Sequence, residues 1–202
     1  MSQLLTEYIH AETKGATAAP LVFTFHGTGG DETQFHGLAR QLMPDAHVVS
    51  PRGDVSEHGM ARFFRRTGEG VYDMDDLAAR TEKMTAFVRS KIAETGASRV
   101  LALGYSNGAN IATAVALKHP EVFTDVIAMH PLIPWQPNPQ PGLARSRWLV
   151  TAGEADPICP APLTHDLLAY LRDQGGDVHE HWHPGGHELV QSELPAIQSF
   201  LR

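Results

Sequence analysis

Cys159 is the only cysteine of the sequence, so no disulfide can form within the chain. Long apolar runs are also missing, and none approaches the length that crosses a bilayer. Residues 1–11 lack the basic start and apolar centre of a targeting segment. The net charge of −7 argues against nucleic acid and anionic membrane surfaces as default partners. These absences predict a cytoplasmic protein with no stable membrane insertion and no nucleic-acid partner.

The length and composition of the chain fit one compact domain. A chain of 202 residues can bury about 70% of its unfolded surface in a single core. Its composition is ordinary for such a domain, with 42% hydrophobic and 19% charged residues and no linker or internal repeat. We therefore expect a single domain over residues 1–202. A homodimer is compatible with the sequence, which carries no signal that decides it.

Short apolar segments alternate with longer amphipathic ones along the chain. Strands are predicted near residues 21–25, 47–50, 99–104, 125–130, 147–152 and 177–183, with an additional strand over 4–11. Helices are predicted near residues 33–43, 73–95, 107–118, 161–174 and 188–201. This alternation predicts an α/β fold in which a mostly parallel central sheet carries helices on both faces.

The most informative motif is Gly104-Tyr105-Ser106-Asn107-Gly108, which follows the apolar run 100–103 and opens a predicted helix. Ser106 therefore stands at a sharp corner between a strand and a helix. Glycines two positions either side let strand and helix approach closely, which pushes the hydroxyl into the open. The helix amino terminus favours negative charge that develops there. The pattern predicts a nucleophile elbow, and a glycine-bounded turn with an incidental serine is the alternative.

A serine nucleophile needs a base and an acid, which follow it in the order serine, acid, histidine when it sits on such an elbow. Asp156 lies in a turn just past an apolar strand, and His187 lies on a loop after a later strand. Both fall at the carboxyl ends of strands, which is the edge of an open α/β sheet where ligands bind. Glu154 shares the turn of Asp156, and His183 precedes His187, so both stay open as alternatives.

The glycine-rich segment from His26 to Glu32 follows another apolar strand, and its glycines let the backbone turn inward. We expect Thr28 of this segment and Asn107 to supply the two backbone N–H groups of an oxyanion hole. A phosphate-binding loop is disfavoured because the Gly-Lys-Ser/Thr ending and the Gly-x-Gly-x-x-Gly spacing are both missing. His26 is expected to brace the loop, and His130 to line the pocket.

These motifs, with Ser50-Pro51-Arg52-Gly53 and Arg62-Phe63-Phe64-Arg65-Arg66, resemble the carboxylesterase/phospholipase branch of the α/β-hydrolases over nearly the whole chain. The resemblance includes bacterial serine esterases similar to dienelactone hydrolases, and it implies an α/β-hydrolase fold without a large cap domain. It also implies hydrolysis of carboxylic esters with small to medium acyl chains, without a cofactor. Dienelactone hydrolases proper use a cysteine where this chain has Ser106, so lactone opening is a secondary expectation.

The same resemblance implies a catalytic triad of Ser106, Asp156 and His187. Together with the proline that follows Asp156, it favours this residue over Glu154 as the acid. The two glycines before His187 form a flexible turn that can bring its ring over the serine, which favours it over His183.

Two connections, over residues 50–72 and 131–146, are longer than the others, and long loops in compact domains are usually functional or disordered. We expect them to wall the pocket for the small-molecule ester. One arginine of the 62–66 segment is a candidate to steer a carboxylate-bearing substrate. For the first connection, the alternative is a solvated basic segment anchored by two core phenylalanines. For the second, proline-rich connection, the alternative is a stiff surface loop. The apolar candidates for substrate binding are Phe63, Phe64, Leu132 and Trp135.

Other interpretations have less support. His179, His181 and His183 alternate along one strand but lack the fourth ligand and supporting groups of a zinc site, so no metal is expected. Cys159 is interpreted as a small packed residue, since a thiol nucleophile would need its own histidine and oxyanion loop. A thioesterase, lysophospholipase or lactone hydrolase would share the chemistry. A non-catalytic ligand-binding protein on the same fold is the alternative of a different class.

Overall fold

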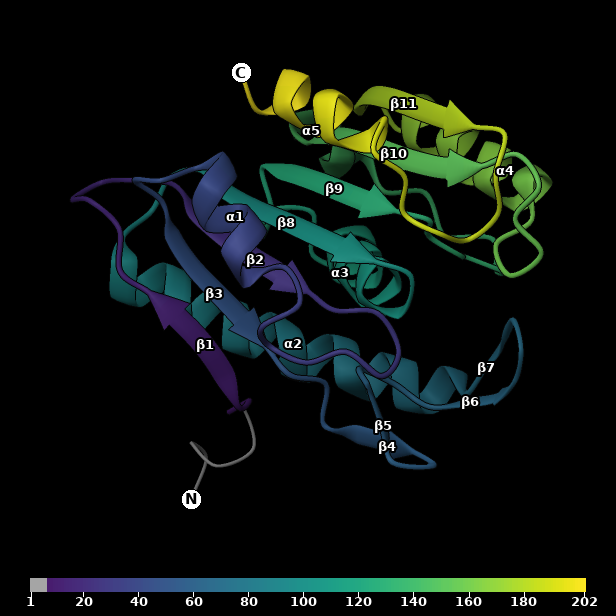
Figure 1. The fold of residues 1–202 in the computed structure, drawn as a ribbon, viewed down its shortest axis with the longest axis horizontal. Coiled ribbons are helices and arrows are strands. Elements are labelled where there is room, and N and C mark those ends of the chain that lie inside the picture. The colour runs from purple at the N-terminus through teal and green to yellow at the C-terminus, as the bar shows by residue number, and fades with distance from the viewer. Residues whose placement is uncertain (1–6) are drawn as a thin grey trace.

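The computed structural model describes residues 7–202, in which seven strands form one central sheet (Figure 1). The strand order is β1-β3-β2-β8-β9-β10-β11, and all neighbours are parallel except β1 with β3 at one edge. The predicted mostly parallel sheet is confirmed. The strands are β1 (His10–Thr13), β2 (Leu21–Phe25), β3 (His47–Pro51), β8 (Val100–Tyr105), β9 (Asp125–Met129), β10 (Arg147–Gly153) and β11 (Asp177–His183).

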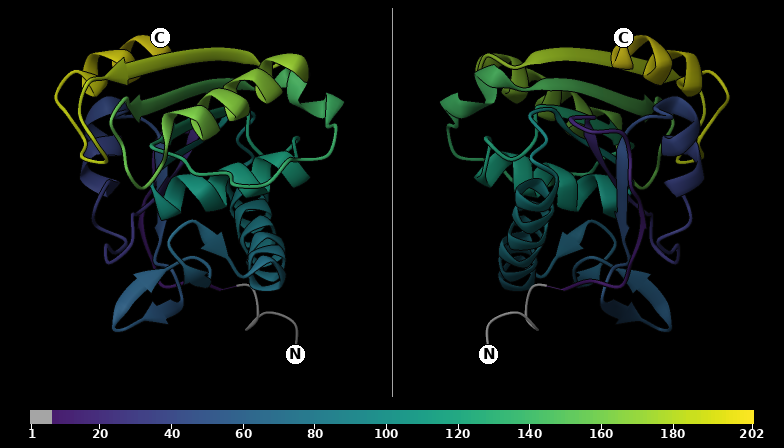
Figure 2. Two further views of the ribbon diagram at one scale, coloured as in Figure 1. Left: turned by 90° about the vertical axis from the view of Figure 1, so that its right-hand side faces the viewer. Right: turned by 90° about the vertical axis from the view of Figure 1, so that its left-hand side faces the viewer.

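Helices cover both faces of this sheet. Figure 2 shows α2, α3 and α4 on one side, and α1 and α5 on the other. A short 3₁₀ helix over Pro141–Arg145 lies in the connection before β10. The helices are α1 (His36–Leu42), α2 (Met74–Thr95), α3 (Asn107–Lys118), α4 (Ala161–Asp173) and α5 (Glu193–Leu201).

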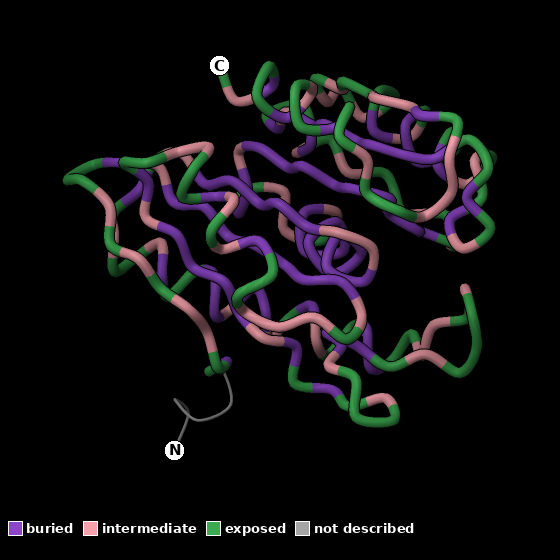
Figure 3. The backbone as a smooth tube through the Cα atoms, viewed as in Figure 1, coloured by how far each residue is buried: buried purple, intermediate pink, exposed green. Residues whose placement is uncertain are grey.

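The apolar runs of the sequence are buried because each strand feeds two cores. Along β8, Val100 and Ala102 belong to the cluster that includes α2, α3 and α4, whereas Leu101 and Leu103 belong to the cluster with α1 and α5. Successive side chains of a strand point to opposite faces, so a strand covered on both sides is apolar at every position. Figure 3 shows the central strands as continuous buried segments.

The connection over residues 50–72 is more regular than the sequence indicates. It forms two small antiparallel hairpins beyond the carboxyl edge of the sheet. Their strands are β4 (Val55–Glu57), β5 (Met60–Arg62), β6 (Arg66–Gly68) and β7 (Val71–Tyr72).

Two predicted boundaries differ from the structure. Helix α5 begins at Glu193, five residues later than the predicted start at 188. A start at 188 would place Pro195 in the helix interior, where its ring clashes with the preceding turn, whereas Pro195 in the first turn is tolerated. The additional strand predicted over 4–11 falls partly outside the described residues, and β1 occupies His10–Thr13.

The strand order places the functional motifs at one point of the sheet. From β2 the chain moves outward to β3 and then returns to the other side of β2 as β8. Loops that leave two such neighbouring strands run in opposite directions, which opens a crevice at their carboxyl ends. The segment after β2 carries Thr28, and the corner after β8 carries Ser106. The fold thereby brings the predicted oxyanion loop and the predicted nucleophile side by side.

Replacement of Gly108 by alanine tests the close approach at this crevice. A Cβ at Gly108 would lie 2.2 Å from the carbonyl oxygen of Phe25 at the end of β2. Since backbone must move to admit it, we expect Gly108→Ala to lower the free energy of unfolding by about 3 kcal/mol. Urea unfolding measures the change.

Gly37→Ala is the matched control, because a Cβ at this position in α1 meets no atom within 4 Å. It should be neutral or stabilise by up to about 1 kcal/mol, through the better helix propensity of alanine. Equal effects of the two substitutions would contradict the packing argument.

Candidate active site

Ser106 occupies a strained corner between β8 and α3. Its backbone has a φ of 53°, in a region that non-glycine residues enter at a cost of about 1–3 kcal/mol. The corner is held on both sides: the Ser106 N–H donates to the carbonyl of Met129 on β9 at 2.9 Å, and the Ser106 carbonyl accepts the Asn110 N–H of α3 at 2.9 Å. The conformation is therefore imposed by the neighbouring strand and helix.

His187 and Asp156 complete a line of hydrogen bonds with the serine. The Ser106 Oγ lies 2.8 Å from Nε2 of His187, and Nδ1 of the same ring lies 2.7 Å from Oδ2 of Asp156. A carboxylate only accepts, so Nδ1 carries the proton and Nε2 offers its lone pair to the hydroxyl. The Tyr105 hydroxyl donates to the backbone carbonyl of His187 at 2.7 Å and fixes the loop between β11 and α5. The structure thus brings together the three residues of the predicted triad.

The Asp156 carboxylate is held through both oxygens. Its Oδ1 accepts the N–H groups of Ile158 and Cys159, each at 2.8 Å. Burial alone would raise the pKa of Asp156, but these N–H groups and hydrogen bonds from two histidine rings outweigh burial and lower that pKa. Asp156 therefore stays ionised beside His187.

The residues left open as alternatives lie elsewhere. Glu154 is exposed on the turn that buries Asp156. The His183 ring is buried and its Nε2 lies 3.4 Å from Nε2 of His130. On the same strand, His179 pairs with Asp177 at 3.3 Å and is largely exposed.

Thr28 and Asn107 both border the space in front of Ser106. Within the described residues 7–202, neither of their backbone N–H groups donates a hydrogen bond. Two unengaged N–H groups beside a nucleophile are what an oxyanion hole requires. The loop that carries Thr28 is fixed from the β5 side, where the Gly29 N–H donates to the carbonyl of Ala61 at 2.9 Å.

His26 ties the same loop to the segment after β3. Its ring donates from Nδ1 to the carbonyl of Gly27 at 2.7 Å and accepts the Gly53 N–H at Nε2 at 2.9 Å. Burial lowers the pKa of His26, so the ring is neutral and can accept at Nε2. This is the bracing position expected from the sequence.

A small cavity of about 30 Å³ opens beside Ser106. Leu132 borders it, as the sequence analysis predicts for a pocket residue. Most of the other side chains around it are polar, and they come largely from the segment 62–72 and from the start of α3. They include Thr28, Arg62, Arg66, Tyr72, Asn107 and Asn110.

Phe63 and Phe64 do not wall this cavity, in contrast to the prediction. Both side chains are 0% exposed and belong to the core between the sheet and α2. The Phe63 ring packs edge-on against Phe25, and the Phe64 ring against Tyr72. Burying each ring stabilises the fold by about 1.5–3 kcal/mol, which outweighs any gain from leaving it at the pocket. The two residues instead anchor the basic segment in the core, as the alternative in the sequence analysis describes.

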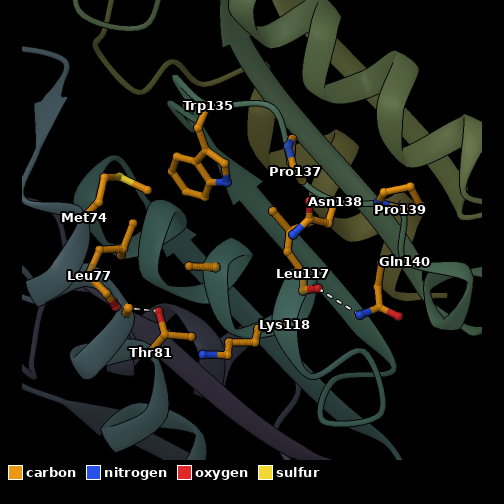
Figure 4. Close-up of a pocket in the computed structure, with 12 residues that line it drawn as sticks. Met74, Leu77, Thr81, Leu117, Lys118, Trp135, Pro137, Asn138, Pro139 and Gln140 are labelled. Atoms are coloured by element: carbon orange, nitrogen blue, oxygen red, sulfur yellow. Dashed lines mark hydrogen bonds between the residues drawn. The ribbon is translucent and has the colours of Figure 1, made fainter.

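Trp135 also lies away from the cavity. It borders a separate groove of about 340 Å³ between α2, α3 and the proline-rich segment 137–140 (Figure 4). Its closest link to the site is Tyr72, whose ring centroid is 6.3 Å from that of Trp135 and which itself borders the cavity beside Ser106. Trp135 therefore does not border the cavity beside Ser106, in contrast to the prediction that it contacts substrate.

A buried ionic network that no sequence motif indicates lies behind Asp156. The His130 side chain is 0% exposed, and its Nδ1 lies 3.2 Å from Oδ2 of Asp156. Its Nε2 lies 3.4 Å from Oε1 of Glu193, the first residue of α5. Glu193 also accepts the hydroxyl of Thr151 and the N–H of Val190. His130 thus lies between two carboxylates. The expectation that it lines the pocket is wrong.

The protonation states in this network support one another. Burial would lower the pKa of His130, but its hydrogen bonds to Glu193 and Asp156 outweigh burial and raise that pKa above its ordinary value of 6.5. Burial would raise the pKa of Glu193, and the bond from His130 is the largest of the contacts that lower it instead. When protonated, His130 is an imidazolium between two carboxylates, and it anchors the acid of the triad from the side opposite His187.

The same groups could hold a cation by spacing alone. His130, His183 and Glu193 offer ligand atoms within 4.8 Å of one another. However, the Gly185 N–H donates to Nδ1 of His183 at 3.1 Å, so the proton of this ring is on Nε2. A protonated Nε2 cannot bind a metal, and His130 is already engaged by Asp156 and Glu193.

Cys159 borders the cavity, but its thiol is in an environment that disfavours reaction. Its side chain is buried, and the thiol donates to the carbonyl of His130 at 3.2 Å. Burial, reinforced by the charge of Asp156, raises the pKa of the thiol. The nucleophilic thiolate is thereby disfavoured, in agreement with its interpretation as a packed residue.

This combination of a parallel sheet, a strained serine and a histidine–carboxylate pair at its carboxyl edge defines an α/β-hydrolase. Residues 8–158 match the model of a family described as "Putative esterase". The chain belongs to this esterase family of ester-hydrolysing enzymes, and the resemblance drawn from its sequence is confirmed. Within the described residues 7–202 there is no large cap over the sheet.

Two individual relatives carry hydrolase names, and a third, of unknown function, shares the fold. The chain is 40% identical over 196 residues to the "Putative hydrolase MhqD" of Bacillus subtilis, covering 96% of this chain and 97% of that protein. The solved structure of Atu2452, a protein of unknown function from Agrobacterium tumefaciens, is 50% identical with a TM-score of 0.92 and covers 100% and 98% of the two chains. The Bacillus cereus carboxylesterase is 33% identical with a TM-score of 0.89, covering 95% of this chain and 92% of that one.

No helix within residues 7–202 is both long enough and apolar enough to span a membrane.

Substitution of His130 tests the buried network. We expect His130→Asn, which tolerates the φ of 50° at this position, to leave two buried carboxylates without a cationic partner. The substitution should cost about 3 kcal/mol of unfolding free energy. Because the pKa of His130 is raised, its contribution to the free energy of unfolding is complete below pH 6.5. This contribution declines as pH rises through the pKa of the folded state. Because the pKa values of Asp156 and Glu193 are lowered, the contributions of these carboxylates to the free energy of unfolding are complete above about pH 4.5.

The destabilisation should therefore be largest between about pH 4.5 and 6.5 and shrink at alkaline pH. Urea unfolding across this range measures it. His179→Asn, at an exposed site on β11, is the control and should change little. A loss for His130→Asn that stays constant with pH would contradict the ionic network.

Proposed function

We propose that the chain is a serine hydrolase that cleaves carboxylic esters with small to medium acyl chains through an acyl-enzyme intermediate, without a cofactor. The observation that carries the proposal is the unbroken line of hydrogen bonds from Ser106 Oγ through His187 to Asp156, at 2.8 and 2.7 Å, beside a cavity. A structural role would not require all three groups at the edge of the sheet where ligands bind.

Acylation begins with proton transfer from the Ser106 hydroxyl to Nε2 of His187. The serine oxygen forms a bond to the ester carbonyl carbon, and the carbonyl oxygen takes up negative charge. Asp156 stabilises the imidazolium that results, because it is ionised and accepts from Nδ1. The backbone N–H groups of Thr28 and Asn107 stabilise the oxyanion, a contribution that elsewhere amounts to about 3–4 kcal/mol per donor.

Collapse of this intermediate breaks the bond to the alcohol, which leaves with the proton from His187. A water molecule then gives a proton to the same ring and attacks the acyl carbon, and the acid is released as Ser106 recovers its proton. Water and ester are the reactants, so the steps balance without an oxidant or a metal.

Related substrates remain as alternatives on the same machinery. A thioester, a lactone or the ester of a lysophospholipid would react through the same steps. A non-catalytic ligand-binding protein is the alternative of another class, and turnover separates it from an esterase. The small-molecule ester as partner, the homodimer, the absence of nucleic-acid and membrane partners, the single domain and the cytoplasmic location remain predictions.

Removal of the serine hydroxyl tests the mechanism. Ser106→Ala should lower kcat for p-nitrophenyl acetate and butyrate by about 10⁴-fold or more, because no other side chain can form the acyl-enzyme. The urea midpoint should stay close to that of the unmodified chain, since the backbone bonds of residue 106 are retained.

Ser98→Ala, at an exposed serine before β8, is the matched control and should keep full turnover. Retention of near-normal turnover by Ser106→Ala would show that another group is the nucleophile.

A further inference from the structure

The cavity beside Ser106 differs from an acyl pocket in its chemistry. Acyl pockets are lined mainly by apolar side chains, whereas here Leu132 and Ile158 face two arginines and several amide and hydroxyl groups. Its volume of about 30 Å³ is roughly twice the minimum that one water requires. The cavity therefore suits one small polar group next to the reacting carbonyl.

Arg62 brings a buried positive charge to this wall. Its side chain is 4% exposed, and its donors reach Thr28 Oγ1 at 2.6 Å and the carbonyl of Phe64 at 3.2 Å. Both of these partners are neutral. The nearest carboxylate, Glu57, lies 3.9 Å away. Buried charge is costly unless it is paired, so the site retains a guanidinium whose charge its own closest contacts do not neutralise.

Glu57 is already engaged by the second arginine. Arg66 donates from Nε and Nη2 to the two oxygens of Glu57 at 2.9 and 3.0 Å. One partly buried carboxylate therefore serves two guanidiniums at the cavity. Glu69, the other acid that acts on Arg66, is exposed, so solvent screens its charge. Among the buried and half-buried groups at the wall, two guanidiniums therefore face one carboxylate.

Asn107 adds a donor that is buried and unused. Its Oδ1 accepts the Phe63 N–H at 2.8 Å, which fixes the orientation of the amide. Its Nδ2 is buried and has no hydrogen-bond partner among the described residues 7–202. The residue is 2% exposed and borders the cavity. A buried donor without a partner destabilises a fold unless a ligand supplies the acceptor.

We propose that this cavity binds a carboxylate of the substrate, so that the enzyme acts on short esters or lactones that carry a second, ionised carboxyl group, such as half-esters of small dicarboxylic acids. The inference rests on the proposed esterase function and names its substrate class. The carboxylate pairs with the guanidiniums of Arg62 and Arg66 and accepts from Nδ2 of Asn107. A carboxylate matches the planar fork of arginine and the small volume of the cavity.

Matched methyl esters test the proposal. Monomethyl succinate carries the ionised carboxyl group, and methyl butyrate is a neutral ester of equal acyl length; acid release from both can be followed in a pH-stat at low ionic strength. We expect kcat/KM to favour monomethyl succinate by roughly tenfold or more, through KM, because charge-assisted hydrogen bonds hold its carboxylate. Succinate should also inhibit hydrolysis of p-nitrophenyl acetate competitively.

Arg66→Met assigns this preference to the cavity. It frees Glu57 to pair with Arg62, so the preference should fall to near unity and the inhibition by succinate should be lost. Arg62→Met should act in the same direction, but Arg66→Met is the cleaner test because Arg62 also holds Thr28. Arg65→Met is the control: Arg65 has a 60% exposed side chain that pairs with Asp73, so both the preference and the inhibition should persist.

The outcomes separate this proposal from the proposed function. Equal kcat/KM for the two methyl esters, or a preference that survives Arg66→Met, would overturn the carboxylate site while leaving the esterase intact. If no ester at all were turned over, p-nitrophenyl acetate included, the proposed function would fail and the carboxylate site with it.

Discussion

The positive φ at Ser106 is the constraint on which the arrangement of the site depends. A φ of 53° is unfavourable for serine, and it persists because β9 and α3 each take up a hydrogen bond of this residue. The turn is possible only where strand and helix nearly touch. At Gly104 a Cβ would lie 2.6 Å from the carbonyl oxygen of Gly108. The glycine spacing of the motif therefore provides the room that an exposed nucleophile at this corner requires.

The parts of the site that follow from chain order could be predicted from the sequence. Apolar runs give the parallel strands, and residues just past a strand reach the same sheet edge. For this reason Ser106, Asp156 and His187, which are distant in sequence, were predicted to meet, and the structure brings them within hydrogen-bonding distance. Thr28 follows from the same reasoning, because β2 is the neighbour of β8.

The rest of the site depends on packing that local sequence patterns do not encode. Phe63 and Phe64 occur in a loop-like basic segment, and only the tertiary fold decides that their rings enter the core. Glu193 was hidden inside a predicted helix, although the Pro195 that follows it could have marked the helix start. Its pairing with His130 spans 63 positions and joins α5 to the end of β9, so no motif announces it.

Covalent labelling measures the central claim, that Ser106 is the activated nucleophile, most directly. A fluorophosphonate should react stoichiometrically and in a time-dependent manner, and peptide mapping should place the phosphonate on Ser106. Labelling should be lost in His187→Ala, because the hydroxyl then has no base within hydrogen-bonding distance. Phosphonate on another residue, or unchanged labelling of Ser106 in His187→Ala, would contradict the account.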